Sequence, residues 1–385
     1  MTTPILPPAM LGIIGGGQLG RMFTIAAKTM GYRVTVLEPE AGCPASTLAD
    51  VHLCASYDDA KALKEMARTC QAVTTEFENV PAASLEFLAQ STRVSPSAEA
   101  VSIAQDRIQE KRYIEASGLD VAPYLPIESA IDLDQDLSGC LPGIMKLARL
   151  GYDGKGQVRV KTADEAREAF RSLGEKPCVL EKMLNLQTEV SVMVARTSPG
   201  IVTTFPVAEN RHEQGILDVS IVPARIDEAT SQKARQMALS LAESLDYVGV
   251  LGVELFILDD GRILINEIAP RPHNSGHYTL DATVTSQFEQ QVRTLCGLPP
   301  SDTRLLSPVV MINLLGDVWG NSEPDWTDLF KHPGLMLHLY GKASARPGRK
   351  MGHFNLLADT LDIALSDALA IKGTLRQKAG LDPSL

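Results

Sequence analysis

Residues 10–40 carry the pattern that most restricts how this chain can fold. The stretch MLGIIGGGQLGRMFTIAAKTMGYRVTVLEPE holds an apolar strand, a glycine turn, an amphipathic helix and a second apolar strand. This order is that of the first βαβ unit of a doubly wound sheet. The apolar segments VHLCAS and AVTTEFENV and a helix pattern in AASLEFLAQ continue the alternation. We therefore expect an N-terminal domain with a doubly wound parallel sheet over residues 1–106.

The rest of the chain indicates two further units. Residues 107–185 predict a small α+β unit, with a helix that Gly118 stops, then a strand, a glycine loop, a strand, a helix and a strand. From residue 186 to residue 385 the pattern is one of long antiparallel strands, with helices near residues 229–245 and 283–296. A small end module from about residue 305 closes this unit, with a last helix near residues 358–372. The expected fold class is thus α/β and α+β.

Composition and charge exclude several classes of protein. A chain of 385 residues is too long for one ordinary core, and no uninterrupted apolar run predicts a membrane span. The opening residues do not resemble a signal peptide. A net charge of −11 without a basic block argues against general binding of nucleic acid. The six cysteines show no C-x-x-C spacing, so we expect small buried side chains in a reducing cytosol.

The first glycine turn permits more than one function. Gly15, Gly17 and Gly20 fit the spacing G-x-G-x-x-G, and Glu38 ends the second strand. Because N–H groups at a helix N-terminus can meet any anion, the motif fits a nicotinamide dehydrogenase or a site for a ribose phosphate. It also fits a turn that only packs a helix closely on the sheet. Gln18 adds an amide that a pyrophosphate does not require.

A second turn brings two acidic side chains together. Asp-Gly at residues 260–261 stands between two apolar strands, which predicts a two-residue hairpin turn. Pairing outward from this turn puts Phe256 opposite Ile265 and Glu254 opposite Glu267. Like charges opposite each other on one face destabilise a hairpin.

A cation between the two carboxylates would remove this repulsion. Mg²⁺ suits oxygen ligands such as Glu254 and Glu267, with Asn266 beside them, and it completes its shell with water and substrate phosphates. The alternative is a register slip that sends one glutamate to solvent.

Between these motifs lies a glycine loop flanked by strands, in IMKLARLGYDGKGQVRV. Its three glycines allow the backbone to approach an oxyanion, and Lys146 and Lys155 can supply charge, so a phosphate lid is expected. A plain glycine hairpin with solvated lysines is the alternative. The strand end EKML at residues 181–184 could read a purine edge, and Glu189 could accept hydrogen bonds from ribose hydroxyls.

Taken in order, these motifs resemble those of a known family. Lys146, GYDGKGQ, EKML, Glu189, GVELF and NEIAPRPHNSGH resemble the ATP-grasp carboxylate–amine ligases over most of the chain. Within them, GGGQLGRM, GYDGKGQ, APRPHNSGHYT and RPGRKMGH resemble the N5-carboxyaminoimidazole ribonucleotide synthase family. The resemblance implies a three-domain ATP-grasp fold, with residues 107–185 as its lid.

The resemblance also implies an activity. In it, ATP phosphorylates bicarbonate to carboxyphosphate, and the amine of 5-aminoimidazole ribonucleotide takes the carboxyl group, in purine biosynthesis. It implies Mg²⁺ (or Mn²⁺) as cofactor, ATP, bicarbonate and the ribonucleotide as small-molecule partners, and a cytoplasmic homodimer.

Site residues follow from the resemblance position by position. ATP-binding residues are expected at Arg107, Lys146, Gly151, Tyr152, Asp153, Gly154, Lys155, Gly156, Gln157, Glu181, Lys182, Met183, Leu184, Glu189, His212, Asn266 and Glu267. Ribonucleotide contacts are expected at Gln18, Leu19, Glu76, Tyr152, Asp153, Lys342, Arg349 and Lys350. The metal ligands would be Glu254 and Glu267, and the catalytic set Arg271, His273, Asn274, Ser275 and Lys350.

Three alternatives stay open at this point. A sister ligase, formate-dependent glycinamide ribonucleotide transformylase, has PRPHDTG where this chain has PRPHNSGH. An NAD-binding oxidoreductase would use the first glycine turn without Mg²⁺. A non-catalytic nucleotide-binding regulator would bind ATP but release no phosphate.

Overall fold

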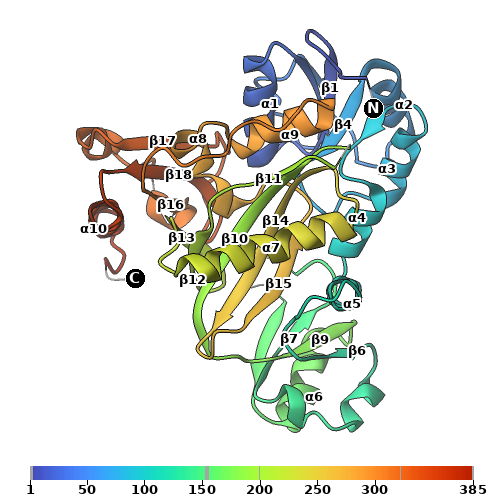
Figure 1. Cartoon of the computed structure of the whole chain (residues 1–385), viewed down its shortest axis with the longest axis vertical. Helices are drawn as coiled ribbons and strands as arrows, with labels where there is room; N and C mark the ends of the chain where they lie inside the picture. The colour runs from blue at the N-terminus through green and yellow to red at the C-terminus, as the bar shows by residue number, and fades with distance from the viewer. Residues whose placement is uncertain (1–2, 152–155, 199, 321, 384–385) are drawn as a thin grey trace.

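Three sheets follow one another along the chain in the computed structural model, which describes residues 3–151, 156–198, 200–320 and 322–383. The parallel sheet and a small antiparallel sheet lie at opposite ends of the longest axis, and a large antiparallel sheet lies between them (Figure 1). The predicted fold class is confirmed: a doubly wound N-terminal sheet precedes two antiparallel sheets.

The N-terminal sheet is parallel, with the strand order β3-β2-β1-β4-β5. Successive residues of β1 face opposite cores: Leu11 and Ile13 pack with α1 and α9, whereas Met10 and Ile14 pack with α2 and α3. Both faces are therefore covered, as an apolar parallel strand requires. The elements are β1 (Met10–Ile14), α1 (Gln18–Thr29), β2 (Arg33–Leu37), β3 (Val51–Leu53), α2 (Ala60–Thr69), β4 (Ala72–Thr75), α3 (Ala82–Ala89), β5 (Arg93–Val94), α4 (Ala98–Ala104) and, from later in the chain, α9 (Gln287–Cys296).

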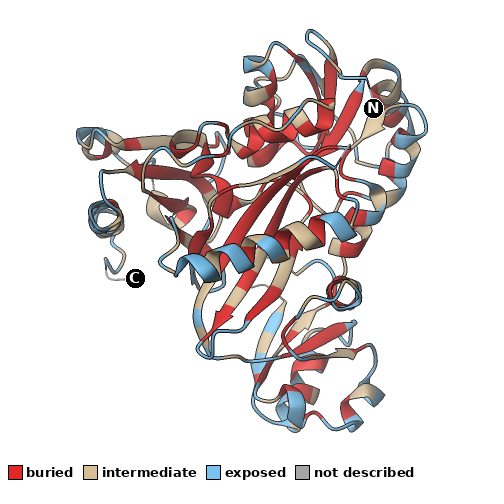
Figure 2. Cartoon of the chain, viewed as in Figure 1, coloured by how far each residue is buried: buried red, intermediate tan, exposed pale blue. Residues whose placement is uncertain are grey.

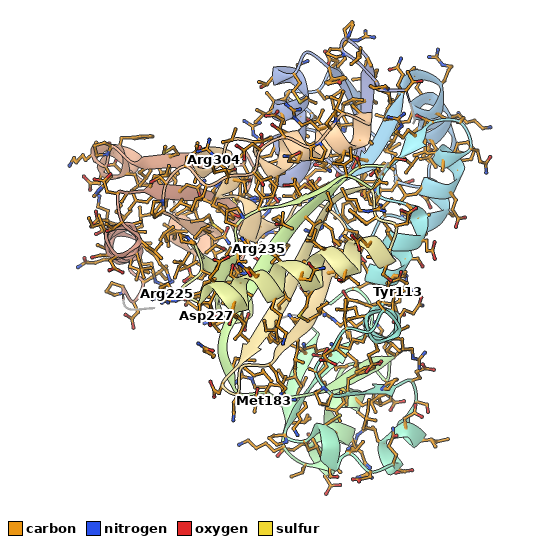
Figure 3. All side chains as sticks on the ribbon, in the orientation of Figure 1. Tyr113, Met183, Arg225, Asp227, Arg235 and Arg304 are labelled. Atoms are coloured by element: carbon orange, nitrogen blue, oxygen red, sulfur yellow. The ribbon has the colours of Figure 1, made fainter. Side chains whose placement is uncertain are left out.

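Helix α5 (Arg107–Ala116) leads into the small sheet, whose order is β6-β9-β7-β8. Its core is formed by α6, where Phe170 packs with Met145 and Leu180 of the sheet. Tyr113 on α5 donates a hydrogen bond to the Ser244 carbonyl at the end of α7 (2.7 Å), which ties α5 to the large sheet (Figure 3). The elements are β6 (Tyr124–Ile127), η1 (Ala130–Asp134), η2 (Ser138–Cys140), β7 (Gly143–Leu147), β8 (Gln157–Val160), α6 (Ala163–Ser172) and β9 (Cys178–Lys182).

The large sheet is antiparallel, with the order β15-β14-β10-β12-β13-β16-β18-β17 and β11 beside β10. Its strands are β10 (Leu186–Arg196), β11 (Val202–Thr204), β12 (Ala208–Glu213), β13 (Ile216–Val222), β14 (Gly249–Leu258), β15 (Ile263–Ala269), β16 (Val309–Leu315), β17 (Leu335–Leu339) and β18 (Lys350–Leu357). The remaining helices are α7 (Glu228–Ser244), η3 (Asn274–Gly276), α8 (Thr279–Ala282), η4 (Gly316–Trp319), η5 (Trp326–Lys331) and α10 (Leu361–Lys378). The strands of the tail thus extend the large sheet.

One helix covers each half of this sheet. Ala234, Ala238 and Leu241 of α7 pack on the valines and leucines of β10 and β14, while the opposite side of α7 is exposed (Figure 2). Ala364 and Ala368 of α10 pack in the same way with residues of β16 and β18. Small residues at helical spacing let both helices lie close to the strands.

The hairpin of β14 and β15 pairs the two glutamates as expected. Glu254 lies opposite Glu267. Nearer the turn, however, the expected pairing of Phe256 with Ile265 is wrong, because Phe256 pairs with Leu264.

The loop shifts the register by one residue, and a bulge farther along β15 shifts it back. The loop has three residues, since the Leu258 N–H bonds the Arg262 carbonyl (2.9 Å) and Gly261 adopts φ 82°, which glycine tolerates well. Farther along β15, Asn266 is an additional residue that forms a bulge, and the bulge restores the predicted register.

The expectation that the cysteines are buried is met at five of the six positions and is wrong for Cys54. All six cysteines have free thiols; five are buried, and Cys54 is exposed. In the described segments, no helix combines the length and the apolar character needed to cross a membrane.

Candidate functional site

A cleft of about 1330 Å³ opens where the three sheets meet. Its described lining comes from the ends of the parallel strands, from β7 and β8, from β10, β12, β14 and β15, and from the tail turn at residues 342–350. Eight glutamates line it, and eight lysines and arginines do so as well. The volume exceeds that of a typical site for a single small ligand, and the balanced charges suit ligands that carry both anions and cations.

The glycine turn at the cleft wall is already occupied by carboxylates of the protein. The Glu76 side chain accepts hydrogen bonds from the N–H groups of Gly17 (2.5 Å) and Leu19 (3.1 Å), and Glu38 accepts one from Gly16 (2.9 Å). Burial raises the pKa of Glu76, and the turn N–H groups oppose this shift. The same N–H groups cannot also bind a dinucleotide pyrophosphate, which argues against the dehydrogenase interpretation.

The side chain of Gln18 connects this turn to the far end of the chain. Its Oε1 accepts a hydrogen bond from Lys342 Nζ (2.9 Å), which also donates to the Lys350 carbonyl (2.6 Å). Arg349 donates to the Ser344 carbonyl (2.8 Å). The predicted ribonucleotide residues of the first turn and of the tail therefore lie together at one wall of the cleft.

The opposed carboxylates of the hairpin also line the cleft. Arg107 Nη1 donates to Glu267 Oε2 (2.7 Å), and His273 Nε2 lies 3.1 Å from Glu254 Oε1. Burial and the neighbouring Glu267 raise the pKa of Glu254 to about 7. Burial opposes ionisation of Glu267 too, but the Arg107 charge lowers its pKa to about 2. The pKa values of these two neighbouring carboxyl groups separate because only Glu267 is bonded to a cation of the described chain, Arg107.

The neighbouring side chains fit a hard divalent cation. Asn266 Oδ1 is buried at the cleft wall, and no hydrogen-bond donor reaches it from the described part of the chain. In that same part, no three His, Cys, Asp or Glu side chains gather as a complete metal site. Two carboxylates and one amide oxygen instead suit Mg²⁺, which leaves positions for water and phosphate.

The loop after β15 presents donors to the cleft. Arg271 Nε donates to Glu78 Oε2 (2.7 Å), which fixes the guanidinium at the wall. Asn274 is 5% exposed, and neither polar atom of its amide has a hydrogen-bond partner among the described residues. Such an amide is costly unless a ligand or water completes it.

Two other predicted members of this loop support each other. Ser275 is fully buried and does not line the cleft; its Oγ accepts from Ser191 Oγ (2.7 Å) and lies 2.9 Å from His273 Nδ1. It therefore orients the His273 ring, which does line the cleft. Burial, together with the charges of Arg271 and Lys350, lowers the pKa of His273 to about 3, so this ring is neutral.

A second histidine of the cleft is held by an acid. His212 Nδ1 lies 2.7 Å from Glu189 Oε2, and both residues line the cleft. Burial opposes protonation, but the bond to Glu189 raises the pKa of His212.

The remaining predicted residues come from the small sheet. Lys146 lines the cleft with Gly151, Gly156 and Gln157, whereas Tyr152, Asp153, Gly154 and Lys155 lie outside the described residues. Glu181 is buried and does not line the cleft, and its side chain accepts a hydrogen bond from Lys146 Nζ (2.8 Å).

The end of β9 continues beyond this pair. Lys182 and Met183 are exposed and Leu184 is half-buried, and none of them lines the cleft. Met183 lies at the border between the small sheet and the large sheet (Figure 3).

Several partners of the site were not predicted. Glu78 holds Arg271, and Glu110 and Lys111 of α5 are buried beside Arg107. Glu38 was expected as the acid that ends the second strand, but not as a partner of the first turn. Arg107, Glu110 and Lys111 stand at spacings of three and four, so they share one helix face. From that spacing Glu110 and Lys111 could have been predicted as neighbours of Arg107.

Comparison with known families agrees with this geometry. Residues 9–105 match the ribonucleotide synthetase preATP-grasp domain, residues 112–288 the ATP-grasp domain, and residues 309–367 the phosphoribosylaminoimidazole carboxylase C-terminal domain. The chain is 46% identical to the N5-carboxyaminoimidazole ribonucleotide synthase of Brucella melitensis over 361 residues, which cover 91% of this chain and 97% of that protein.

Solved structures show the same similarity. An N5-carboxyaminoimidazole ribonucleotide synthetase in complex with ADP aligns with a TM-score of 0.91 and 45% identity, over 96% of this chain and 98% of that chain. The Aspergillus clavatus enzyme in complex with ADP and 5-aminoimidazole ribonucleotide aligns with a TM-score of 0.87 and 30% identity, over 96% and 99% of the two chains.

Proposed function

Because the chain belongs to the N5-carboxyaminoimidazole ribonucleotide synthase family of ATP-grasp ligases, we propose that it carboxylates 5-aminoimidazole ribonucleotide. ATP and bicarbonate would be consumed, with ADP and phosphate released, in de novo purine biosynthesis. The observation that carries the proposal is the opposed pair of Glu254 and Glu267 at the floor of a cleft large enough for two ligands.

The nucleotide is proposed to bind between the small and the large sheet. Arg107 and Lys146 would meet its phosphates, and Glu189 and His212 its ribose side. The backbone of residues 181–184 and the glycine loop at residues 151–157 would complete this part of the site. Glu254, Glu267 and Asn266 would hold Mg²⁺, or Mn²⁺, which when bound neutralises charge on the phosphates.

Bicarbonate is proposed to bind beside the loop after β15. Arg271 offers a planar guanidinium already fixed by Glu78, and Asn274 offers an unpaired amide. A bicarbonate oxygen would attack the γ-phosphorus of ATP, and the bond to the ADP oxygen would break. Because phosphoryl transfer depends mainly on positioning and charge, prefixed donors suit this step. Neutral His273, which Ser275 orients, would border the same anion.

The amine would then attack the carbonyl carbon of carboxyphosphate. A carbon–nitrogen bond forms, the carbon–oxygen bond to phosphate breaks, and the released phosphate can take the proton that the amine loses. Lys342, Arg349 and Lys350 would bind the ribonucleotide phosphate, with Gln18, Leu19 and Glu76 near its base and ribose. Closure of the cleft would protect the intermediate from water.

The direct test is ADP release from MgATP and bicarbonate, with and without 5-aminoimidazole ribonucleotide. We expect strong stimulation by the ribonucleotide and its loss in Glu267→Ala, because metal and oxyanion devices contribute several kcal/mol. The same substitution at Glu243, an exposed residue of α7, is the matched control. Turnover of formate with glycinamide ribonucleotide, and none of bicarbonate, would favour the sister ligase.

Two further outcomes would favour other classes. Binding of NADH without any need for Mg²⁺ would support an oxidoreductase. ATP binding that survives Glu254→Ala and Glu267→Ala, with no phosphate release by the wild type, would support a regulator.

The remaining proposals rest on the family resemblance. We propose a cytoplasmic homodimer that divides into residues 1–106, 107–185 and 186–385. Light scattering on the purified chain tests the dimer, and limited proteolysis tests the boundaries.

A further inference from the structure

Lys111 on α5 is a lysine buried almost completely behind the cleft. Its side chain is 1% exposed, and its Nζ has no hydrogen-bond partner in the described part of the chain. The nearest carboxylate oxygen is Glu181 Oε1, at 3.3 Å, and the Tyr124 ring centre lies 5.8 Å away. Because burial of an ammonium group is costly, its presence needs a compensating interaction.

Glu181 supplies that interaction and shares it with a second lysine. Its Oε2 accepts a hydrogen bond from Lys146 Nζ (2.8 Å), and its side chain is 4% exposed. Burial alone would raise the pKa of Glu181, but the charges of Lys111 and then Lys146 lower it to about 2. A buried carboxylate thus stands between two cations, of which only Lys146 lines the cleft.

The order of these three charges matters for an anionic ligand. Lys146 and Glu181 alone would form a neutral pair, and a phosphate would gain little from approaching it. Lys111 adds one positive charge from behind, so the group of three keeps one net positive charge. The described lysines and arginines of the cleft only equal its glutamates in number, and Lys111 adds to them a cation from outside the lining.

From this geometry we propose that Lys111 is a positioning residue for the nucleotide, which offsets the charge of Glu181 and so leaves Lys146 free to attract the triphosphate. The inference rests on the proposed function in so far as Lys146 meets the phosphates of ATP. We therefore expect that the net charge of Lys111, Glu181 and Lys146 together, and not the presence of Lys111 itself, determines the affinity for the nucleotide.

The test compares Lys111→Met, Glu181→Gln and the double variant. Lys111→Met should raise the KM for ATP and the Kd for ADP by roughly tenfold, and leave the KM values for bicarbonate and the ribonucleotide within about twofold. The double variant carries the wild-type net charge at Lys146, so its KM and Kd should return to within about threefold of wild type. A purely structural role of Lys111 would not produce this recovery.

A matched control separates lost stability from lost affinity. Arg196 is 9% exposed, bonds Asp246 and does not line the cleft, so Arg196→Met should lower the melting temperature without changing the KM for ATP. If Lys111→Met alone does not fold, the double variant decides, because it removes the buried charges of Lys111 and Glu181 together and keeps the charge of Lys146, which lines the cleft.

Two results would overturn the inference. One is a wild-type KM for ATP in Lys111→Met, and the other is a folded double variant whose Kd for ADP is tenfold or more above wild type. Wild-type protein that releases no ADP would refute the proposed function instead, and calorimetry with ADP would still test Lys111.

Discussion

Gly316 is expected to control the position of the basic turn that would bind the ribonucleotide phosphate. Its N–H bonds the Arg349 carbonyl (2.8 Å), and the next residue, Asp317, accepts from the Gly348 N–H (2.7 Å). A Cβ added at Gly316 would lie 2.2 Å from the Arg346 carbonyl oxygen and 2.5 Å from its nitrogen. Both are backbone atoms, so no side-chain rotation relieves the overlap.

The magnitude follows from this overlap. A Cβ essentially never lies within 3.0 Å of a non-bonded heavy atom, so the turn must move by about 1 Å in Gly316→Ala. A displacement of this size at a binding group can cost on the order of 100-fold in rate. We therefore expect kcat/KM for the ribonucleotide to fall roughly ten- to hundredfold. Overpacking should also lower the free energy of unfolding by about 1–3 kcal/mol.

Initial rates of ADP release at varied ribonucleotide, with saturating MgATP and bicarbonate, measure the effect. The KM for ATP should stay near wild type, because the turn bonds Gln18 of the first glycine turn, whereas Lys146 belongs to β7 of the small sheet. Gly139→Ala is the matched control, since a Cβ there meets no atom within 4 Å. A stable Gly316→Ala variant with wild-type kcat/KM for the ribonucleotide would refute the role assigned to this turn.

Three further predictions concern other parts of the molecule. Arg271→Lys should reduce kcat/KM for bicarbonate roughly ten- to hundredfold, because a point charge cannot replace the planar fork fixed by Glu78; unchanged rates at low bicarbonate would contradict this. The pKa of Glu181 is about 2 in the folded protein, against an ordinary value of 4.5 for a glutamate. Its contribution to stability is therefore complete above pH 4.5 and is lost as the pH falls toward 2. In urea titrations the unfolding free energies of wild type and Glu181→Gln should therefore converge by about 1.4 kcal/mol per pH unit below 4.5, and a constant difference would contradict the shift. Gly20→Ala puts a Cβ 2.6 Å from the Gly15 carbonyl oxygen, so it should melt at a lower temperature than Gly139→Ala, and equal melting temperatures would contradict close packing there.

The sequence was most informative where interactions are local. Period-two and helical patterns predicted the sheets. The expected start of a helix near residue 283 was too early. Ser286 caps α9 by accepting a hydrogen bond from the Glu289 N–H (3.1 Å), so the helix begins at Gln287. The pairing of Glu254 with Glu267 was predicted correctly although the turn was not. The three-residue loop and the bulge each shift the register by one residue, in opposite directions, and no local pattern signalled either.

Contacts between distant segments could not be predicted. Glu78 and Arg271 are 193 residues apart, and nothing in the sequence around Glu78 distinguishes it from a surface acid. The resemblance placed Glu76 among the ribonucleotide contacts, but not the bond of its carboxylate to a turn 59 residues earlier, which decides against a dinucleotide site. Glu78 meets Arg271 because two domains pack against each other, and Glu76 meets the turn because β4 lies beside β1 in the sheet. Local sequence patterns carry little information on either arrangement.

The ion pairs of the cleft share one physical design. Three of its cations are each bonded at 2.7–2.8 Å to a glutamate from another segment: Arg107 to Glu267, Lys146 to Glu181 and Arg271 to Glu78. Long cationic side chains lose much conformational entropy when they bind a ligand, and a carboxylate partner fixes them before the ligand arrives. The same carboxylate, however, offsets the charge that the ligand needs. Phosphoryl transfer depends on both positioning and charge. A buried cation behind the pair, such as Lys111, supplies the charge, while the carboxylate continues to fix the position of the cation that meets the ligand.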